Sequence, residues 1–175
     1  FFWWMDKNEE GTTMITAPEG GKVDPNNYTI ERYYSMEKIP EEYREYVEEI
    51  GEIKGNLAYT LGYVKVTKNE FNDTLYVYMN NVGDKLRFEI RIYPEEIQRV
   101  RETYPGYTFE REFEDEGISF DVFSKEESSG EYTYIMYFYY GKEKYIVIGR
   151  NDEDRIQDIV IAYKNVVLSH EGNQQ

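Results

Sequence analysis

Residues 85–93, KLRFEIRIY, alternate between apolar and charged side chains, and this pattern restricts the fold more than any other stretch of the chain. Successive side chains of a β-strand point to opposite faces of the sheet, so Leu86 and Phe88 would lie on one face and Arg87 and Glu89 on the other. A strand with one buried and one solvated face is typical of an antiparallel sheet. The stretch therefore predicts an antiparallel strand whose charged face meets water.

Residues 131–140, EYTYIMYFYY, form a predicted strand of a different kind, because both of its faces are apolar. Tyr134 and Phe138 belong to one face, and Ile135 and Tyr137 belong to the other. Two interpretations follow from this pattern: a central strand covered on both sides, or a strand whose second face lines a groove.

Three segments predict helices, at residues 40–50, 94–104 and 152–167. The first two begin with proline followed by two glutamates, which is favoured in a first helical turn, and each has apolar residues at helical spacing. The third can be capped by Asn151 or Asp152. With alternating stretches between them, these segments predict an α+β fold: a mainly antiparallel, twisted sheet of about seven or eight strands with about three helices packed on it.

The chain is predicted to contain one domain. Residues 6–27 are polar and rich in glycine and proline, and we expect residues 1–27 to form a membrane-proximal segment and linker. Residues 28–168 are predicted to form a single α+β domain, which is long enough to bury a core. Residues 169–175 are predicted to be a polar tail, and they contain the only histidine, His170.

The first four residues, Phe1, Phe2, Trp3 and Trp4, contain both tryptophans of the chain. Aromatic residues beside an acidic, polar run are typical of the interfacial end of a membrane helix. The alternative is a first strand, or an aromatic plug that docks on the core. We favour the membrane-proximal interpretation, in which the protein contacts a membrane only through a missing N-terminal anchor.

Charge and composition argue against several classes of function. The formal net charge is -15, which argues against nucleic acids and anionic lipid surfaces as partners. The chain has no cysteine, which excludes disulfides, iron–sulfur clusters and thiolate zinc sites. Catalytic triads and Cys–His pairs need a positioned imidazole, and a lone histidine in a polar tail does not provide one. We expect no catalytic residues, no cofactor, and a protein that is not an enzyme.

Acidic residues gather at 110–116 and at 152–154. A calcium loop needs several oxygen ligands around a tight bend with glycine, and the segment that begins at Asn151 lacks both that glycine and a final glutamate. We interpret the first group as a solvated strand face and the second as charges at a helix start. No metal site is predicted.

The tyrosines carry the remaining functional signal, because aromatic faces on a sheet can stack on sugars or clasp peptides. Tyrosine also replaces phenylalanine in sheet cores, so a purely structural role is the alternative. The candidate binding residues lie on the aromatic strand and on the first helix beside it: Tyr132, Tyr134, Phe138, Tyr140 and Tyr43. The predicted function is non-enzymatic binding of a protein, a peptide or a cell-wall component. The alternatives are a hydrolase with a pair of carboxylates and a carrier of an apolar ligand.

Three stretches resemble a known group of domains: IPEEY, LYVYMNNVGDKLRFEIRIY and EKYIVIGRNDEDRIQDIVIAYKNV. They are similar to small extracytoplasmic domains of unknown function that follow a single membrane helix in Gram-positive bacteria, some of them on anti-sigma-factor-like regulators or on lipoproteins. The resemblance covers residues 36–167 and carries no catalytic motif. It implies a sensor or interaction domain outside the cell membrane and tethered to it.

Overall fold

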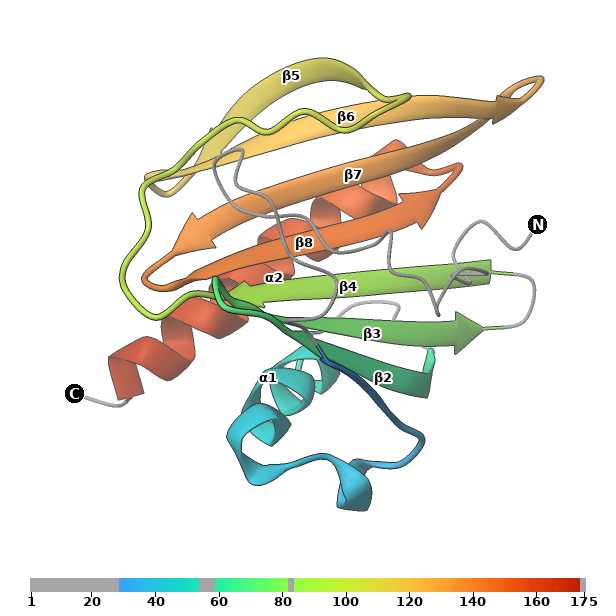
Figure 1. Cartoon of the computed structure of the whole chain (residues 1–175). Coiled ribbons are helices and arrows are strands. Elements are labelled where there is room, and N and C mark those ends of the chain that lie inside the picture. Colours follow the sequence, from blue (N-terminus) through green and yellow to red (C-terminus); the bar gives the residue numbers. More distant parts are fainter. Residues whose placement is uncertain (1–28, 54–58, 82–83, 174–175) are drawn as a thin grey trace.

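The computed structural model describes residues 29–53, 59–81 and 84–173 (Figure 1). The described residues form one 8-stranded sheet in which every neighbouring pair of strands is antiparallel. The strands are β1 (Thr29–Tyr33), β2 (Thr60–Lys68), β3 (Asp73–Asn81), β4 (Asp84–Ile92), β5 (Thr108–Asp115), β6 (Ile118–Ser128), β7 (Glu131–Tyr140) and β8 (Glu143–Arg150). The helices are the short 3-10 helix η3 (Met36–Lys38), α1 (Glu41–Gly51) and α2 (Glu153–Asn173).

The strand order is β1-β2-β3-β4-β8-β7-β6-β5, so the sheet consists of two four-strand meanders joined where β4 pairs with β8. Because β4 lies at the centre and β5 at one edge, the segment between them has to pass over β8, β7 and β6. This segment, residues 93–107, is called the strap. In Figure 1 it runs in yellow-green in front of the sheet, on the side opposite α2.

The face of the sheet under α2 carries the main apolar core. The helix buries Ile156, Val160 and Tyr163 against the sheet, as the helical spacing predicts. The Tyr163 ring meets the rings of Phe88 and Phe138 edge to face, with ring centroids 5.4 and 6.0 Å apart. Aromatic rings favour this arrangement because the positive edge of one ring meets the negative face of another.

The start of α2 depends on two local features. Asp152 Oδ1 accepts a hydrogen bond from the backbone N–H of Arg155 at 3.1 Å, which satisfies one of the unpaired donors of the first turn. Gly149 of β8 lets the helix approach closely, because a Cβ atom there would lie 2.2 Å from Ile156 Cδ1. The strand therefore passes directly into a helix packed on its own sheet.

The predicted fold class is wrong. The described residues contain two α-helices on a single, fully antiparallel sheet, and the strap segment predicted as a helix at 94–104 is irregular. Backbone bonds to the β7–β8 turn hold its first part: the N–H groups of Tyr93 and Ile97 donate to the carbonyls of Lys142 and Gly141 at 2.9 and 3.1 Å. These N–H groups therefore bond to carbonyls of the β7–β8 turn and not to carbonyls of a helical turn.

The charged face of β4 is also not solvated as predicted. Glu89 and Arg91 are only 6% and 8% exposed. Each charge has a partner, since Arg87 Nη2 lies 3.0 Å from Glu89 Oε1 and Arg91 Nη1 lies 2.9 Å from Glu102 Oε1 of the strap. Buried charges are tolerated when they are paired in this way. Alternation alone correctly separated the two faces, but it did not indicate that the charged one would be covered.

α2 continues through His170 to Asn173, so residues 169–173 of the predicted polar tail belong to this helix. Among the described residues, no helix has the length and apolar character required to cross a membrane. The membrane-proximal segment and linker predicted at residues 1–27, with its aromatic start, lies outside the described residues and stays a prediction.

Candidate functional site

The five predicted binding residues do not form one open surface. Phe138 and Tyr43 are buried, at 0% and 4% exposure, and Tyr134 and Tyr140 are partly buried against the core under α2. Only Tyr132, at 37%, is substantially exposed. The reason is that α2 packs on the strand face that we predicted to bind a ligand. β7 is a central strand that is covered on both sides. Tyr139, on its second face, also lines a groove.

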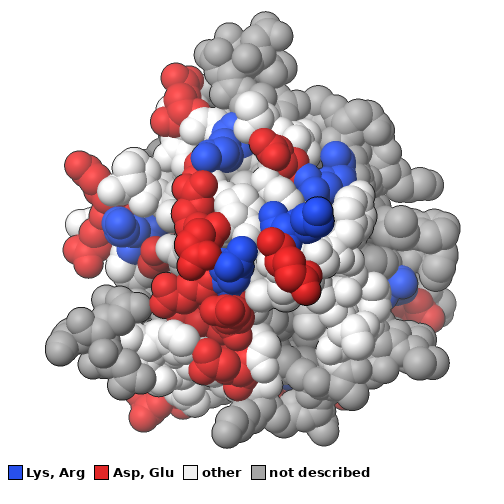
Figure 2. Space-filling view, turned by 90° about the horizontal axis from the view of Figure 1, so that it is seen from below, with Lys and Arg blue, Asp and Glu red and all other residues white. Residues whose placement is uncertain are grey.

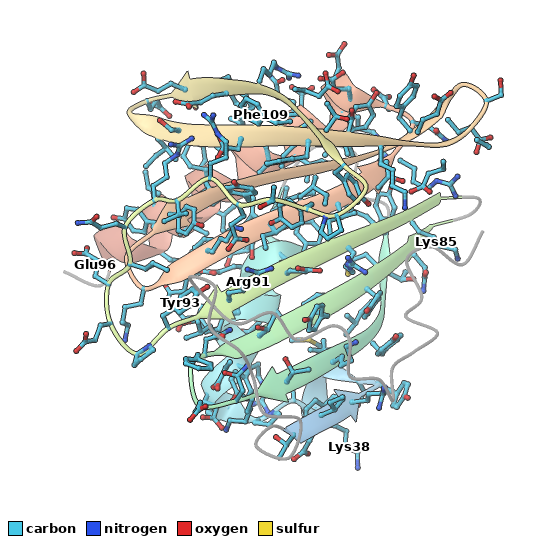
Figure 3. All side chains as sticks on the ribbon, turned by 45° about the horizontal axis from the view of Figure 1, so that its top comes forward. Lys38, Lys85, Arg91, Tyr93, Glu96 and Phe109 are labelled. Carbon is cyan, nitrogen blue, oxygen red and sulfur yellow. The ribbon has the colours of Figure 1, made fainter. Side chains whose placement is uncertain are left out.

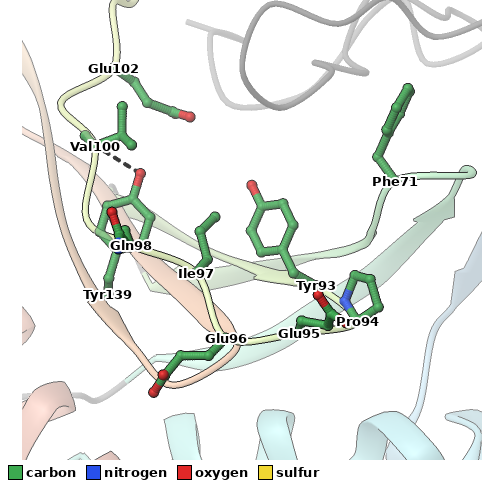
Figure 4. Close-up of a pocket in the computed structure, with 10 residues that line it drawn as sticks. All are labelled: Phe71, Tyr93, Pro94, Glu95, Glu96, Ile97, Gln98, Val100, Glu102 and Tyr139. Carbon is green, nitrogen blue, oxygen red and sulfur yellow. Dashed lines mark hydrogen bonds between the residues drawn. The ribbon is translucent and has the colours of Figure 1, made fainter.

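This groove, called the strap groove, is a cavity of about 470 Å³ between the strap, the end of β7 and the β2–β3 turn (Figure 4). Its apolar lining consists of Phe71, Tyr93, Pro94, Ile97, Val100 and Tyr139. A hydrogen bond from the Tyr139 hydroxyl to the carbonyl of Val100, at 2.9 Å, fixes the strap over the strand. The groove is therefore bounded by one regular strand and one irregular segment anchored to it.

A buried ion cluster lies beside the groove. Lys144 of β8 is fully buried, and its Nζ donates to Glu102 of the strap and, at 2.9 Å, to the Tyr104 hydroxyl. Glu102 also accepts two bonds from Arg91 Nη1, at 2.9 and 3.1 Å. Figure 3 shows Arg91 on the sheet, with Tyr93 and Glu96 farther along the chain after β4. The Lys144 ammonium lies 3.8 Å from the ring centroid of Tyr137, a cation–π distance.

The ion cluster keeps Glu102, which lines the groove, negatively charged. Burial and the neighbouring Arg91 lower the pKa of Lys144 to about 7. Burial raises the pKa of Glu102, but Arg91 and Lys144 more than offset this effect, so the pKa of Glu102 is lowered overall. Glu102 therefore stays ionised at the groove, whereas Lys144 changes its charge near neutral pH.

Asp121 of β6 is a second buried charge under the strap and is fully buried. Arg99 Nη2 donates to its Oδ1 at 2.6 Å, and Arg101 Nε lies 3.5 Å from the same oxygen. The Arg101 guanidinium also lies 4.0 Å from the ring centroid of Phe109. The middle of the strap is thus held by ion pairs rather than by an apolar stripe.

A second cavity, called the acidic pocket, has a volume of about 370 Å³ and lies between α1, α2 and the β7–β8 turn. Four glutamates are among the residues that line it, and one of them, Glu143, accepts a hydrogen bond from the Tyr46 hydroxyl at 2.8 Å. Burial raises the pKa of Glu49 to about 7, although His170 acts in the opposite direction. Seen from below, the molecule carries a nearly continuous band of acidic side chains beside basic ones (Figure 2).

Sequence reasoning missed Lys144 and His170, although each had a signal. Lys144 shares the strand period of Ile146 and Ile148, so a lysine occupied an apolar-face position. His170 follows Val167 at helical spacing, which continues the buried stripe of α2 into the predicted tail. At both positions a polar residue occupies a place where the strand or helix periodicity predicts a buried side chain.

Comparison of the chain with protein-family models, with curated proteins and with solved structures found no match. The resemblance to extracytoplasmic domains therefore stays a prediction, and the function has to be argued from the geometry of the strap groove and the acidic pocket.

Proposed function

We propose that this protein is a non-enzymatic binding domain whose strap groove takes a polypeptide segment with an apolar side chain next to a basic one. The observation that carries the proposal is the lining of the groove, in which aromatic and aliphatic walls are combined with charges of one sign only. The extracytoplasmic location implied by the resemblance is part of the proposal and is supported by the sequence alone.

The apolar part of the ligand follows from the walls and the size of the groove. A volume of about 470 Å³ falls within the range of sites that hold small ligands or a few side chains. Val100 is 46% exposed, and Ile97 is half-buried, so the groove offers apolar surface that a ligand would remove from water. The bonds that anchor Tyr93, Ile97 and Tyr139 support a preformed groove, which lowers the entropic cost of binding.

The basic part of the ligand follows from the charges. The charged residues that line the groove, among those the structure describes, are Glu95, Glu96 and Glu102. Glu102 is already matched by Arg91 and Lys144, whereas Glu95 and Glu96 are exposed at the rim. The net charge of -15 would also attract a basic ligand over longer distances at low salt.

The two alternative functions have less support. A carrier of an apolar ligand needs an enclosed apolar cavity, but the space under α2 is filled by rings such as those of Phe88, Phe138 and Tyr163. A hydrolase with two carboxylates needs an acid and a free base in one cleft. The acidic pocket has an acid with a raised pKa in Glu49, but Tyr46 already donates to Glu143.

The proposal is tested by titrating the full chain with fluorescent peptides that present leucine or phenylalanine beside lysine or arginine, with acidic versions of the same peptides as the comparison. We expect the basic peptides to bind and the acidic ones not to bind. Glu96→Lys should weaken binding about tenfold or more at low salt, and less at high salt, because exposed charges are screened.

The matched control is Glu114→Lys, which makes the same charge change on β5 at an exposed residue outside the groove lining. A second variant, Ile97→Asp, tests the apolar wall. If neither Glu96→Lys nor Ile97→Asp changes the affinity relative to Glu114→Lys, the groove is not the binding site.

A further inference from the structure

The acidic pocket brings together the only histidine of the chain and the carboxylates of one helix face. Glu45 and Glu49 are one turn apart on α1, and His170 projects from the last part of α2. His170 Nδ1 lies 3.9 Å from Glu45 Oε1 and 3.7 Å from Glu49 Oε2. One ligand atom from each of the three residues lies within 4.8 Å of the other two.

We propose that these three residues bind one divalent transition-metal ion, with His170 Nδ1 and one carboxylate oxygen each from Glu45 and Glu49 as its ligands. The proposal goes beyond the proposed function, because it concerns a different cavity and a different ligand.

A separate observation points to a ligand at this place. Glu49 is 6% exposed, and its Oε1 atom is buried without a hydrogen-bond partner. Buried carboxylate oxygens are normally satisfied, since a buried acceptor without a partner is costly. Because Glu49 lines the pocket, a cation bound there by Oε2 would neutralise the charge that the carboxylate shares with Oε1.

The imidazole is oriented as a metal ligand requires. His170 Nε2 lies 2.7 Å from Glu52 Oε2, and Glu52 is the C-cap residue of α1, three positions after Glu49. A carboxylate at this distance favours the N–H on Nε2, which leaves the lone pair on Nδ1, the nitrogen that lies 3.9 and 3.7 Å from the Glu45 and Glu49 oxygens. Metal-binding histidines are commonly held by such an outer carboxylate. Glu52 is therefore a positioning residue.

The ligand set indicates the class of ion. One imidazole nitrogen with two carboxylates suits zinc, cobalt or manganese, whereas calcium prefers six to eight oxygen ligands. Bonds of about 2.0–2.1 Å to zinc place tetrahedral ligand atoms about 3.4 Å apart. The separations of Nδ1 from the two carboxylate oxygens, 3.7 and 3.9 Å, exceed this value by a few tenths of an ångström, and all three ligand atoms lie within 4.8 Å of one another. The remaining positions on the metal would face the pocket, where water can bind.

The test uses the full chain after treatment with a chelator and dialysis. We expect titration calorimetry with zinc chloride to give one ion per chain, and cobalt chloride to give the visible absorption of a four- or five-coordinate ion. The thermal midpoint should rise by several degrees when free zinc is about 100 times its dissociation constant. Calcium chloride should bind much more weakly.

Four variants locate the site. His170→Gln and Glu49→Gln should each weaken zinc binding about tenfold or more, and Glu52→Gln should weaken it about 10–100-fold while the cobalt absorption persists. Glu48→Gln is the control, because it removes one exposed carboxylate from α1 outside the cluster, and it should bind zinc like the unmodified chain. Melting curves in chelator show whether each variant is folded.

The proposal is overturned if the unmodified chain binds no zinc, or if His170→Gln and Glu49→Gln bind it as tightly as Glu48→Gln. It is also overturned if calcium binds as tightly as zinc and His170→Gln leaves both unchanged, since the pocket would then act only as a cluster of acids. If His170→Gln does not fold, the comparison of Glu49→Gln with Glu48→Gln decides.

Discussion

The two faces of the sheet are covered by different means. On one face a regular helix, α2, buries aliphatic and aromatic side chains such as Ile156, Phe88 and Phe138. On the other face the strap is held to the strands by ion pairs and tyrosine hydroxyls, with Lys144 and Asp121 fully buried beneath it. A face with buried charges can thus be covered by an irregular segment, but the conformation of that segment depends on specific partners.

This difference has a consequence for function. A helix packed on an apolar face leaves little room for a ligand, whereas an irregular segment anchored at separate points leaves space between the anchors. The strap groove lies between such points, beside the ion cluster of Glu102 and Lys144. The helix face supplies most of the apolar burial, and the strap face supplies the groove.

The largest loss of stability is expected for a substitution in the core under α2. Phe138→Ala removes a fully buried ring that packs on Phe120, Tyr145 and Tyr163, and it should lower the free energy of unfolding by about 3–5 kcal/mol. Urea denaturation measures this loss. Tyr132→Ala, an exposed position on the same strand, should cost less than about 1 kcal/mol. Equal losses for the two variants would contradict the packing described here.

The next largest loss of stability is expected for a substitution in the ion cluster under the strap. Glu102→Gln removes the anion between Arg91 and Lys144, and we expect the free energy of unfolding to fall by about 2–3 kcal/mol. The loss is less than for an ordinary buried pair because Lys144 can release its proton. Glu95→Gln, at the exposed rim of the groove, should have almost no effect in the same urea titration. A Glu102→Gln protein as stable as Glu95→Gln would show that the cluster does not hold the strap.

The stability of the strap face should also depend on pH. The pKa of Lys144 is about 7 in the folded protein, below its ordinary value of 10.5. Between these values the unfolded chain binds more protons, so this residue makes stability rise with pH, on the order of 2 kcal/mol between pH 7 and 9. The difference in free energy of unfolding between the unmodified chain and Lys144→Met isolates this contribution. A difference that does not change from pH 7 to 9 would show that Lys144 keeps its charge.

The smallest effect is expected for Lys144→Met itself at pH 7. The apolar side chain has a similar length, removes a buried charge and leaves Glu102 paired with Arg91 alone. The change in the free energy of unfolding should be less than about 1 kcal/mol in either direction, because replacing a buried ion by an apolar side chain is often neutral. A loss above about 2 kcal/mol would mean that the Lys144 ion pair stabilises the strap face.

Local patterns in the sequence predicted the elements that bury one apolar face. The alternation around Phe88 and the helical spacing of Ile156, Val160 and Tyr163 both match the structure. The strap was predicted wrongly, because its segment has helical spacing as well. Its conformation depends instead on the sheet order and on later strands, which provide the Tyr137 hydroxyl as acceptor for the N–H of Glu102 at 3.0 Å.

The candidate sites depend on residues far apart in the chain, and for this reason local patterns could not predict them. Lys144 and Glu102 are 42 positions apart, and His170 and Glu52 are 118 apart. Tyr93 and Ile97, which line the groove, lie close to the start of the helix predicted at 94–104. A regular helix at this position does not predict a groove. A polar residue at a buried position of the period, as at Lys144, indicates that a partner exists without indicating which residue it is.

The division of the sheet into two meanders also bears on how the chain reaches its folded state. Pairing within each meander joins neighbouring strands, whereas the β4–β8 pairing brings Leu86 beside Gly149 and Ile92 beside Glu143, after a long loop has closed. Because distant pairings form slowly, we expect this junction to form late in folding. Until it forms, the edges of β4 and β8 are open, and this is the condition under which two copies can exchange equivalent halves and form a swapped dimer.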